Sequence, residues 1–176
     1  MAARVAVAAA FLAAALVSSS AAHTSTAGSC AFRLVAGPPW SEATGQHTLT
    51  LVLRNTATAS CHVNGYPRVT LRTAGGRKLG FVYRDGGDQM LTHNPPHWVA
   101  VDERGSVFFA INKYRCDVRA TAVARLAQVE LPGSPSVISV RLPHYPVLDY
   151  CPAQAAGIGV DVSPIEPSLR ALSAHQ

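Results

Sequence analysis

The loop sequence MLTHNPPHW, residues 90–98, brings together residue types that are suited to binding a metal ion. A thioether sulfur at Met90 and imidazoles at His93 and His97 lie within eight positions, and soft sulfur combined with imidazole suits copper. A cupredoxin-type site also needs a free cysteine ligand near the C-terminal end of the chain, whereas all four cysteines here are better explained as disulfides. We therefore favour exposed loop histidines, and keep an exported copper-binding protein that uses Met90, His93 and His97 as the alternative.

Hydrolytic chemistry has weaker support in the sequence. A catalytic triad is defined by geometry rather than by order along the chain. The side chains that would have to converge with a serine are His47, His62, His144, Asp117 and Asp149. No G-x-S-x-G nucleophile elbow is present. Asp85 and Asp88 flank two glycines, a poor scaffold for the paired acids of a glycosidase. We expect no enzymatic activity and no cofactor, with a small secreted hydrolase as the third hypothesis.

Two tryptophans raise the question of ligand binding. Trp40 follows Gly-Pro-Pro, and Trp98 follows Pro-Pro-His. Exposed aromatic side chains on loops at one end of a sandwich would suit carbohydrate or protein recognition. Trp40, His97 and Trp98 are thus the candidate binding residues. For Trp98 alone we favour a core position, and Trp40 is left open between a binding residue and a lid on the sheet.

Four cysteines indicate two disulfides in an exported protein. None of them forms a C-x-x-C pair, so the spacings of a zinc knuckle and of a thioredoxin-type motif are missing. Sequential pairing, Cys30 with Cys61 and Cys116 with Cys151, closes two loops of similar size and is the pairing that we favour. Spacing leaves the other two connectivities open.

The first residues have the pattern of a targeting segment. Arg4 precedes an apolar run at residues 5–17, and small residues follow up to Ala22, which predicts a signal peptide over residues 1–22. The run is shorter than the roughly 20 residues of a transmembrane helix, and no second such run follows, so we expect no transmembrane segment after processing. Lipidation at Cys30 is the rival interpretation. The sequence then predicts a short linker, a single domain and a C-terminal tail, at residues 23–29, 30–167 and 168–176.

Charge is sparse despite a basic balance. The formal net charge is +5, yet only 14% of residues are charged, against about 25% in a typical domain. The arginines are scattered along the chain, whereas a nucleic-acid surface would cluster them with aromatic residues. We therefore expect no nucleic-acid partner. An unidentified envelope protein or polymer remains the expected partner.

Period-two alternation of apolar residues predicts strands along the chain. The expected strands are residues 30–35, 47–55, 78–84, 97–101, 106–114, 127–133, 136–142 and 157–162. Between the second and the third of these, Cys61 and Val63 begin a further element, in which Val69 and Leu71 face inward after the turn. Turn signals such as Asn64-Gly65 separate them. Only residues 120–126 have weak helical character. The pattern indicates an all-β fold, an antiparallel β-sandwich of about seven to nine strands.

Four segments carry a resemblance to a known family. They are LVLRNTATASCHVNGYP at 51–67, VAVDERGSVFFAI at 99–111, KYRCD at 113–117 and the closing DYC…VDVSPIEP, which ends at Pro167. With Cys30, they resemble the secreted actinobacterial family known as domain of unknown function 4232. The resemblance implies an Ig-like sandwich with two disulfides near the cell envelope, and implies no catalytic residues. A Pro-Gly turn common in the family is replaced here by residues 102–105, whose final glycine still allows the reversal.

These observations together predict an exported, non-enzymatic interaction or structural module of the cell envelope. Its binding residues would lie on loops, chiefly around Trp40 and over residues 85–98. The protein would be secreted or associated with the envelope.

Overall fold

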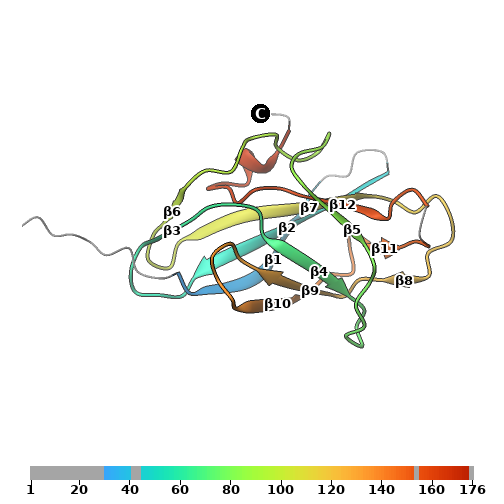
Figure 1. Ribbon diagram of the computed structural model, residues 1–176, viewed down its shortest axis with the longest axis horizontal. Coiled ribbons are helices and arrows are strands. Elements are labelled where there is room, and N and C mark those ends of the chain that lie inside the picture. Colours follow the sequence, from blue (N-terminus) through green and yellow to red (C-terminus); the bar gives the residue numbers. More distant parts are fainter. Residues whose placement is uncertain (1–29, 41–44, 153–154, 175–176) are drawn as a thin grey trace, which may run out of the picture.

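The computed structural model describes residues 30–40, 45–152 and 155–174 of the chain. The predicted signal peptide, residues 1–22, and the predicted linker, residues 23–29, lie outside the described residues. In chain order the elements of the described part are β1 (Phe32–Pro39), β2 (Gln46–Asn55), β3 (Cys61–Val63), β4 (Arg68–Arg72), β5 (Val82–Asp85), β6 (Val99–Val101), β7 (Ser106–Tyr114), β8 (Ala122–Val123), β9 (Leu126–Glu130), β10 (Val137–Arg141), β11 (Asp149–Tyr150), β12 (Gly159–Val162) and the 3-10 helix η1 (Arg170–Leu172) (Figure 1).

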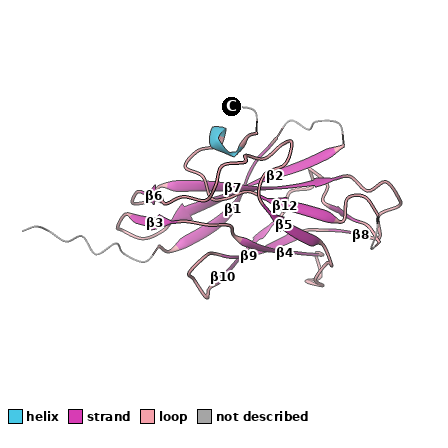
Figure 2. Ribbon diagram, turned by 45° about the horizontal axis from the view of Figure 1, so that its top comes forward, coloured by secondary structure: helices cyan, strands magenta, loops and turns pink. Residues whose placement is uncertain are grey.

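Two sheets form the layers of a sandwich (Figure 2). One contains five strands in the order β1-β2-β7-β12-β5, and the other contains three in the order β10-β9-β4. Apolar side chains from both layers meet in one continuous hydrophobic core. Two short ribbons, β3–β6 and β8–β11, lie at opposite ends of the molecule. The predicted all-β sandwich is confirmed.

The pairing of β2 with β7 is the longest in the five-stranded sheet. It runs without interruption from Gln46 opposite Tyr114 to Arg54 opposite Ser106. Alternate residues of a strand face opposite sides of the sheet, so Leu49, Leu51 and Leu53 enter the core and are almost completely buried. This is the alternation from which the strand was predicted.

One strand pair departs from the antiparallel pattern. β5 and β12 run parallel, with Gly159 opposite Val82 and Val162 opposite Asp85. Parallel neighbours need a long crossover connection, and here the whole chain between β5 and β12 supplies it. β5 therefore completes the edge of the sheet only when the C-terminal part of the chain is in place.

The outer face of the five-stranded sheet is covered rather than left to solvent. The loop after β5 and the segment after β12 pack there around a second apolar cluster of Leu91, Ala110 and Leu172. Backbone hydrogen bonds join the two covering segments, from Thr92 N to Leu172 O at 2.7 Å and from Ala174 N to Met90 O at 3.0 Å. Residues 168–174, which we expected to form a tail, thus pack against the domain.

The weak helical prediction for residues 120–126 is wrong. Ala122–Val123 forms β8 and pairs with β11, and β9 begins at Leu126. Helix propensity is a weak determinant that tertiary context often overrides. Here the pairing with a strand that is distant in the sequence decides the conformation.

Both disulfides have the sequential pairing that we favoured. Cys30 bonds to Cys61 and Cys116 bonds to Cys151, with Cα–Cα distances of 5.4 and 5.8 Å. The first joins the start of β1 to β3, and the second joins the chain after β7 to the chain after β11. Within the described ranges, no helix is long and apolar enough to cross a membrane.

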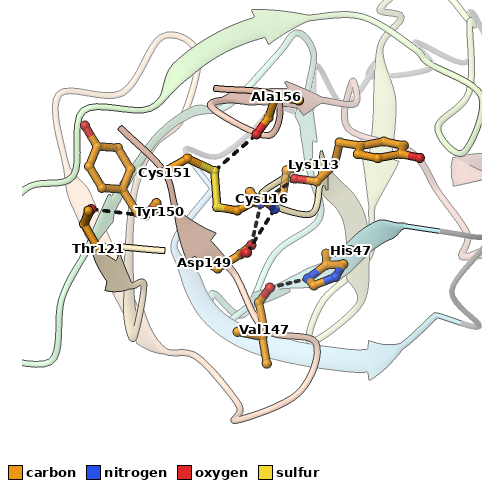
Figure 3. A network of polar contacts seen from close by, with 10 residues as sticks. His47, Lys113, Cys116, Thr121, Val147, Asp149, Tyr150, Cys151 and Ala156 are labelled. Carbon is orange, nitrogen blue, oxygen red and sulfur yellow. Dashed lines mark hydrogen bonds and ion pairs between the residues drawn. A yellow bond between two sulfur atoms is a disulfide. The ribbon is translucent and has the colours of Figure 1, made fainter. Parts of the chain in front are cut away.

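An ion pair inside the protein lies beside the second disulfide (Figure 3). Lys113, on the core face of β7, is fully buried, and its Nζ donates to Asp149 Oδ1 at 2.6 Å. The Cys116 N–H donates to the other carboxylate oxygen at 3.0 Å. Burial lowers the pKa of Lys113. Burial alone would raise the pKa of Asp149, but the hydrogen bonds from Lys113 and Cys116 outweigh it and the net pKa is lowered.

Replacing Lys113 by methionine should lower the free energy of unfolding by about 3–5 kcal/mol, because the Asp149 charge would remain buried without its cation. The double variant K113M/D149L should recover much of that loss, since it removes both charges. Urea denaturation at neutral pH measures both effects. A K113M protein as stable as the wild type would show that this pair does not stabilise the fold.

Candidate ligand-binding groove

Trp98 is exposed to solvent, so its interpretation as a core residue is wrong. It directly precedes β6, and 70% of its surface is accessible. Val99 and Val101 occupy the buried face of β6. Because side chains alternate along a strand, Trp98 and Ala100 must face outward. The indole makes no hydrogen bond or ring contact within the described residues.

Trp98 lines a groove of about 980 Å³ at the end of the sandwich that carries β3 and β6. We call it the Trp98 groove. One set of its lining residues comes from the β3–β6 ribbon, namely His62, Asn64 and Trp98. A second set comes from the turn between β9 and β10, residues 131–136. The remaining lining residues are Cys30, Ala31, Phe32, Val63 and Ile138.

Gly65 allows the β3–β6 ribbon to lie close to the β9–β10 turn. Its φ of +111° lies in a region that side chains disfavour, and a Cβ at this position would lie 2.8 Å from Cγ of Pro132. The Gly65 carbonyl also accepts a hydrogen bond from Ile165 N at 3.1 Å. The bend at Gly65 therefore brings two sides of the groove into contact.

The Trp98 groove is uncharged. None of its lining residues is aspartate, glutamate, lysine or arginine. A smaller cleft of about 480 Å³ on the other side of the same turn is different, since Arg68, Asp85 and Glu130 line it. The two hollows share residues 131–134. The turn thus separates a neutral surface from a charged one.

The predicted metal ligands lie outside the groove. Met90 is half-buried, and His93 and His97 are exposed. His97 Nδ1 lies 3.4 Å from the Pro95 carbonyl, and its Nε2 lies 3.9 Å from the Glu166 carboxylate. In residues 30–40, 45–152 and 155–174, no group of three or more His, Cys, Asp or Glu side chains is placed to hold a metal.

Trp40 and Trp98 occupy different places in the molecule. Trp40 is half-buried and packs against the cluster of Leu91, Ala110 and Leu172 on the outer face of the five-stranded sheet. The sequence leaves Trp40 open between a binding residue and a lid on the sheet, and its position is that of a lid. Among the three candidate binding residues, Trp98 alone lines the groove.

Two of the residues that a triad would need, His47 and Asp149, are held in structural contacts (Figure 3), whereas Asp117 and His144 are exposed. His47 Nδ1 contacts the Val147 carbonyl, and both oxygens of Asp149 accept hydrogen bonds, from Lys113 and from the Cys116 N–H. His62 lies elsewhere, on the wall of the Trp98 groove. The polar network around Asp149 therefore anchors β11 and the second disulfide.

The sequence of this chain matches the sequence model of one protein family over residues 30–164. The chain belongs to the family Domain of unknown function (DUF4232). No curated protein and no solved structure matches it significantly. The DUF4232 match spans both disulfides and every residue that lines the Trp98 groove.

The groove could be predicted only in part from the sequence. Asn64-Gly65 and Gly133-Ser134-Pro135-Ser136 are recognisable as turn signals. In the structure Gly65 lies in a bend, and a hydrogen-bonded turn spans residues 131–134. His62, Asn64 and Ser134 were not predicted as binding residues, because no local signal shows that these two distant turns meet. The alternation of Val99 and Val101 was sufficient to predict that Trp98 is exposed.

A buried carboxyl lies beyond the DUF4232 match, beneath the loop that leads to Trp98. The Glu166 side chain is only 1% exposed. Its Oε1 accepts a hydrogen bond from Asn94 Nδ2 at 3.3 Å. Burial raises the pKa of this carboxyl, and Asn94 and His97 compensate only in part. Ionisation of Glu166 therefore costs more free energy in the folded protein than in the unfolded chain.

The variant E166Q should melt at a higher temperature than the wild type near pH 7. Because the pKa of Glu166 is higher in the folded protein than in the unfolded chain, the protonated side chain stabilises the fold. This stabilisation is complete below the unfolded-state pKa, about 4.3 for glutamate, and is lost as the pH rises through the folded-state pKa. The advantage of E166Q should therefore shrink towards pH 4. Melting curves across this range test the prediction, and a difference that does not depend on pH would contradict it.

The variant G65A should lower the free energy of unfolding by about 1–3 kcal/mol, because it adds backbone strain and a clash with Pro132. G76A is the matched control. Gly76 also has a positive φ, +84°, but a Cβ there would meet nothing within 4 Å. Urea denaturation should show a larger loss for G65A. Equal losses would mean that the approach to Pro132 is not tightly constrained.

Proposed function

We propose that the protein is an exported, non-enzymatic binding module of the cell envelope, and that its partner binds in the Trp98 groove. The observation that carries the proposal is a 70% exposed tryptophan on a groove of about 980 Å³. Tryptophan is among the residues most enriched at binding hot spots. Concave sites with apolar lining and few polar groups are the usual form of ligand sites.

Export is supported by the cysteines and by the N-terminal sequence. Every cysteine of the chain is in a disulfide, and disulfides persist mainly in oxidising compartments outside the cytosol. The signal-peptide pattern of residues 1–22 agrees with that environment.

A binding role, rather than a catalytic one, is supported further by two ion pairs in which charged side chains bond to each other. Lys113 and Asp149 bond to each other, and Arg84 forms a two-fold hydrogen-bonded pair with Asp161. Catalytic groups need free access to a substrate. Trp98, in contrast, is free to contact a partner.

Sedimentation of the purified protein with isolated cell envelopes of the producing species tests this function. The W98A variant should bind at least about tenfold more weakly, the loss expected for a hot-spot residue. Its melting temperature should be nearly unchanged, because an exposed side chain contributes little to stability.

V118A is the control, since Val118 is also an exposed apolar residue, 49% accessible, and lines neither hollow. It should bind as the wild type does. The proposal fails if the wild type does not sediment with envelopes, or if W98A sediments equally well.

A further inference from the structure

We infer that the ligand of the Trp98 groove is an uncharged saccharide chain, with a sugar ring stacked on the indole of Trp98. This inference rests on the proposed binding function of the groove and specifies the chemical class of its ligand. Three independent properties of the lining support it: its lack of charge, the hydrogen-bonding capacity of its side chains, and the placement of its apolar surfaces.

The lack of charge excludes ligands whose binding depends on charge. An anionic polymer or a charged peptide that entered the groove would lose water and gain no counter-charge, which is costly. Arg68, Asp85 and Glu130 lie nearby but line the other cleft, across the β9–β10 turn. The side of the turn that presents the exposed tryptophan is therefore the side without formal charge.

The polar side chains of the groove suit hydroxyl groups. His62, Asn64, Ser134 and Ser136 line it, and an imidazole, an amide or a hydroxyl can each both donate and accept hydrogen bonds. Sugar hydroxyls have the same dual capacity. Ser134 Oγ already accepts a bond from Ser136 N at 3.2 Å, which leaves its O–H available to donate.

The apolar surfaces of the groove suit the C–H face of a sugar ring. Trp98 offers a broad flat face, and the antiparallel register that pairs Val63 with Val99 places Asn64 beside it. A pyranose ring with an apolar face and a polar edge can stack on the indole while its hydroxyls reach Asn64. The volume of about 980 Å³ is at the upper end of the roughly 300–1,000 Å³ typical of ligand sites, so a segment of several sugars fits better than a monosaccharide.

The groove needs little rearrangement to bind. The β9–β10 turn contains Pro132 and Pro135, and a backbone hydrogen bond from Ser134 N to Leu131 O closes it at 3.0 Å. The Cys30–Cys61 disulfide fixes the start of β1 against β3. A preformed site avoids much of the entropy cost of ordering, which matters for a ligand whose individual contacts are weak.

An uncharged peptide is the competing occupant. Peptides are commonly held by backbone hydrogen bonds to an open strand edge. The Trp98 groove is lined by the polar residues His62, Asn64, Ser134 and Ser136, and β3 and β6 have only three residues each, so their outer edges offer little length for such pairing. The saccharide is therefore the better match, and the peptide becomes an outcome of the test.

The test uses the envelope-sedimentation assay with treated envelopes. Periodate, which cleaves the vicinal diols of sugars, should abolish the Trp98-dependent binding, whereas protease treatment should leave it intact. Raising the salt from about 0.05 M to about 0.5 M, which strongly shortens the range of electrostatic attraction, should not weaken it. W98F should retain more binding than W98A, because phenylalanine keeps an aromatic face.

Several outcomes would overturn the saccharide while leaving the binding module in place. Trp98-dependent binding that protease removes and periodate leaves intact would identify a protein partner. Binding that survives both treatments would contradict a saccharide that carries vicinal diols. Binding that falls steeply with salt would identify an anionic polymer. If no Trp98-dependent binding to untreated envelopes is found, the proposed function itself fails.

A spectroscopic measurement supplements the binding assay. The chain has two tryptophans, so W40F leaves Trp98 as the only indole fluorophore, and Trp40 is not part of the groove. Polysaccharide released from the envelopes should change the emission of W40F. The same material after periodate treatment should not. An unchanged spectrum with active polysaccharide would contradict stacking on Trp98.

Discussion

The ladder between β2 and β7 is the constraint on which the rest of the structure depends. Its unbroken register, from Gln46–Tyr114 to Arg54–Ser106, determines which side chains face each side of the sheet. Leu51 and Phe109 enter the core, while Thr48 bonds to Asn112 on the outer face at 2.7 Å. A shift of one residue would exchange these two faces. Both the core and the covering segments would then lose their partners.

The same register places charge inside the sandwich. Lys113 follows Ile111 on the core face of β7, so its ammonium must find a partner away from water, and Asp149 supplies it. This pair and the Cys116–Cys151 disulfide anchor the end of the sandwich at β8 and β11. The Cys30–Cys61 disulfide anchors the opposite end of the sandwich, at β3 and β6. The groove lies at that second end, where turns rather than long strands form the surface.

The sequence predicted the strands that have their own apolar alternation, and failed where tertiary contacts decide. β2, β7 and β10 are recognisable because one face of each carries apolar residues. β8 and β11 have two residues each and exist only because they pair, so alanine-rich residues 120–126 gave a misleading helical signal. The burial of Lys113 and Glu166 depends on partners that are distant along the chain. The groove could not be predicted as a whole, because its residues come from four separate segments.

The residues that stabilise this domain differ from those of the proposed binding site. The core, the Lys113–Asp149 pair and the disulfides hold the sheets together, and Trp98 takes part in none of them. A side chain that is 70% exposed has little stabilising effect to lose, and tryptophan is highly buried on average in folded proteins. Glycine at position 65 has no side chain of its own, but it allows the ribbon and the Pro132 turn to meet. The shape of the groove thus depends on Gly65 and Pro132, whereas the proposed binding depends on Trp98, Asn64 and the serines that line it.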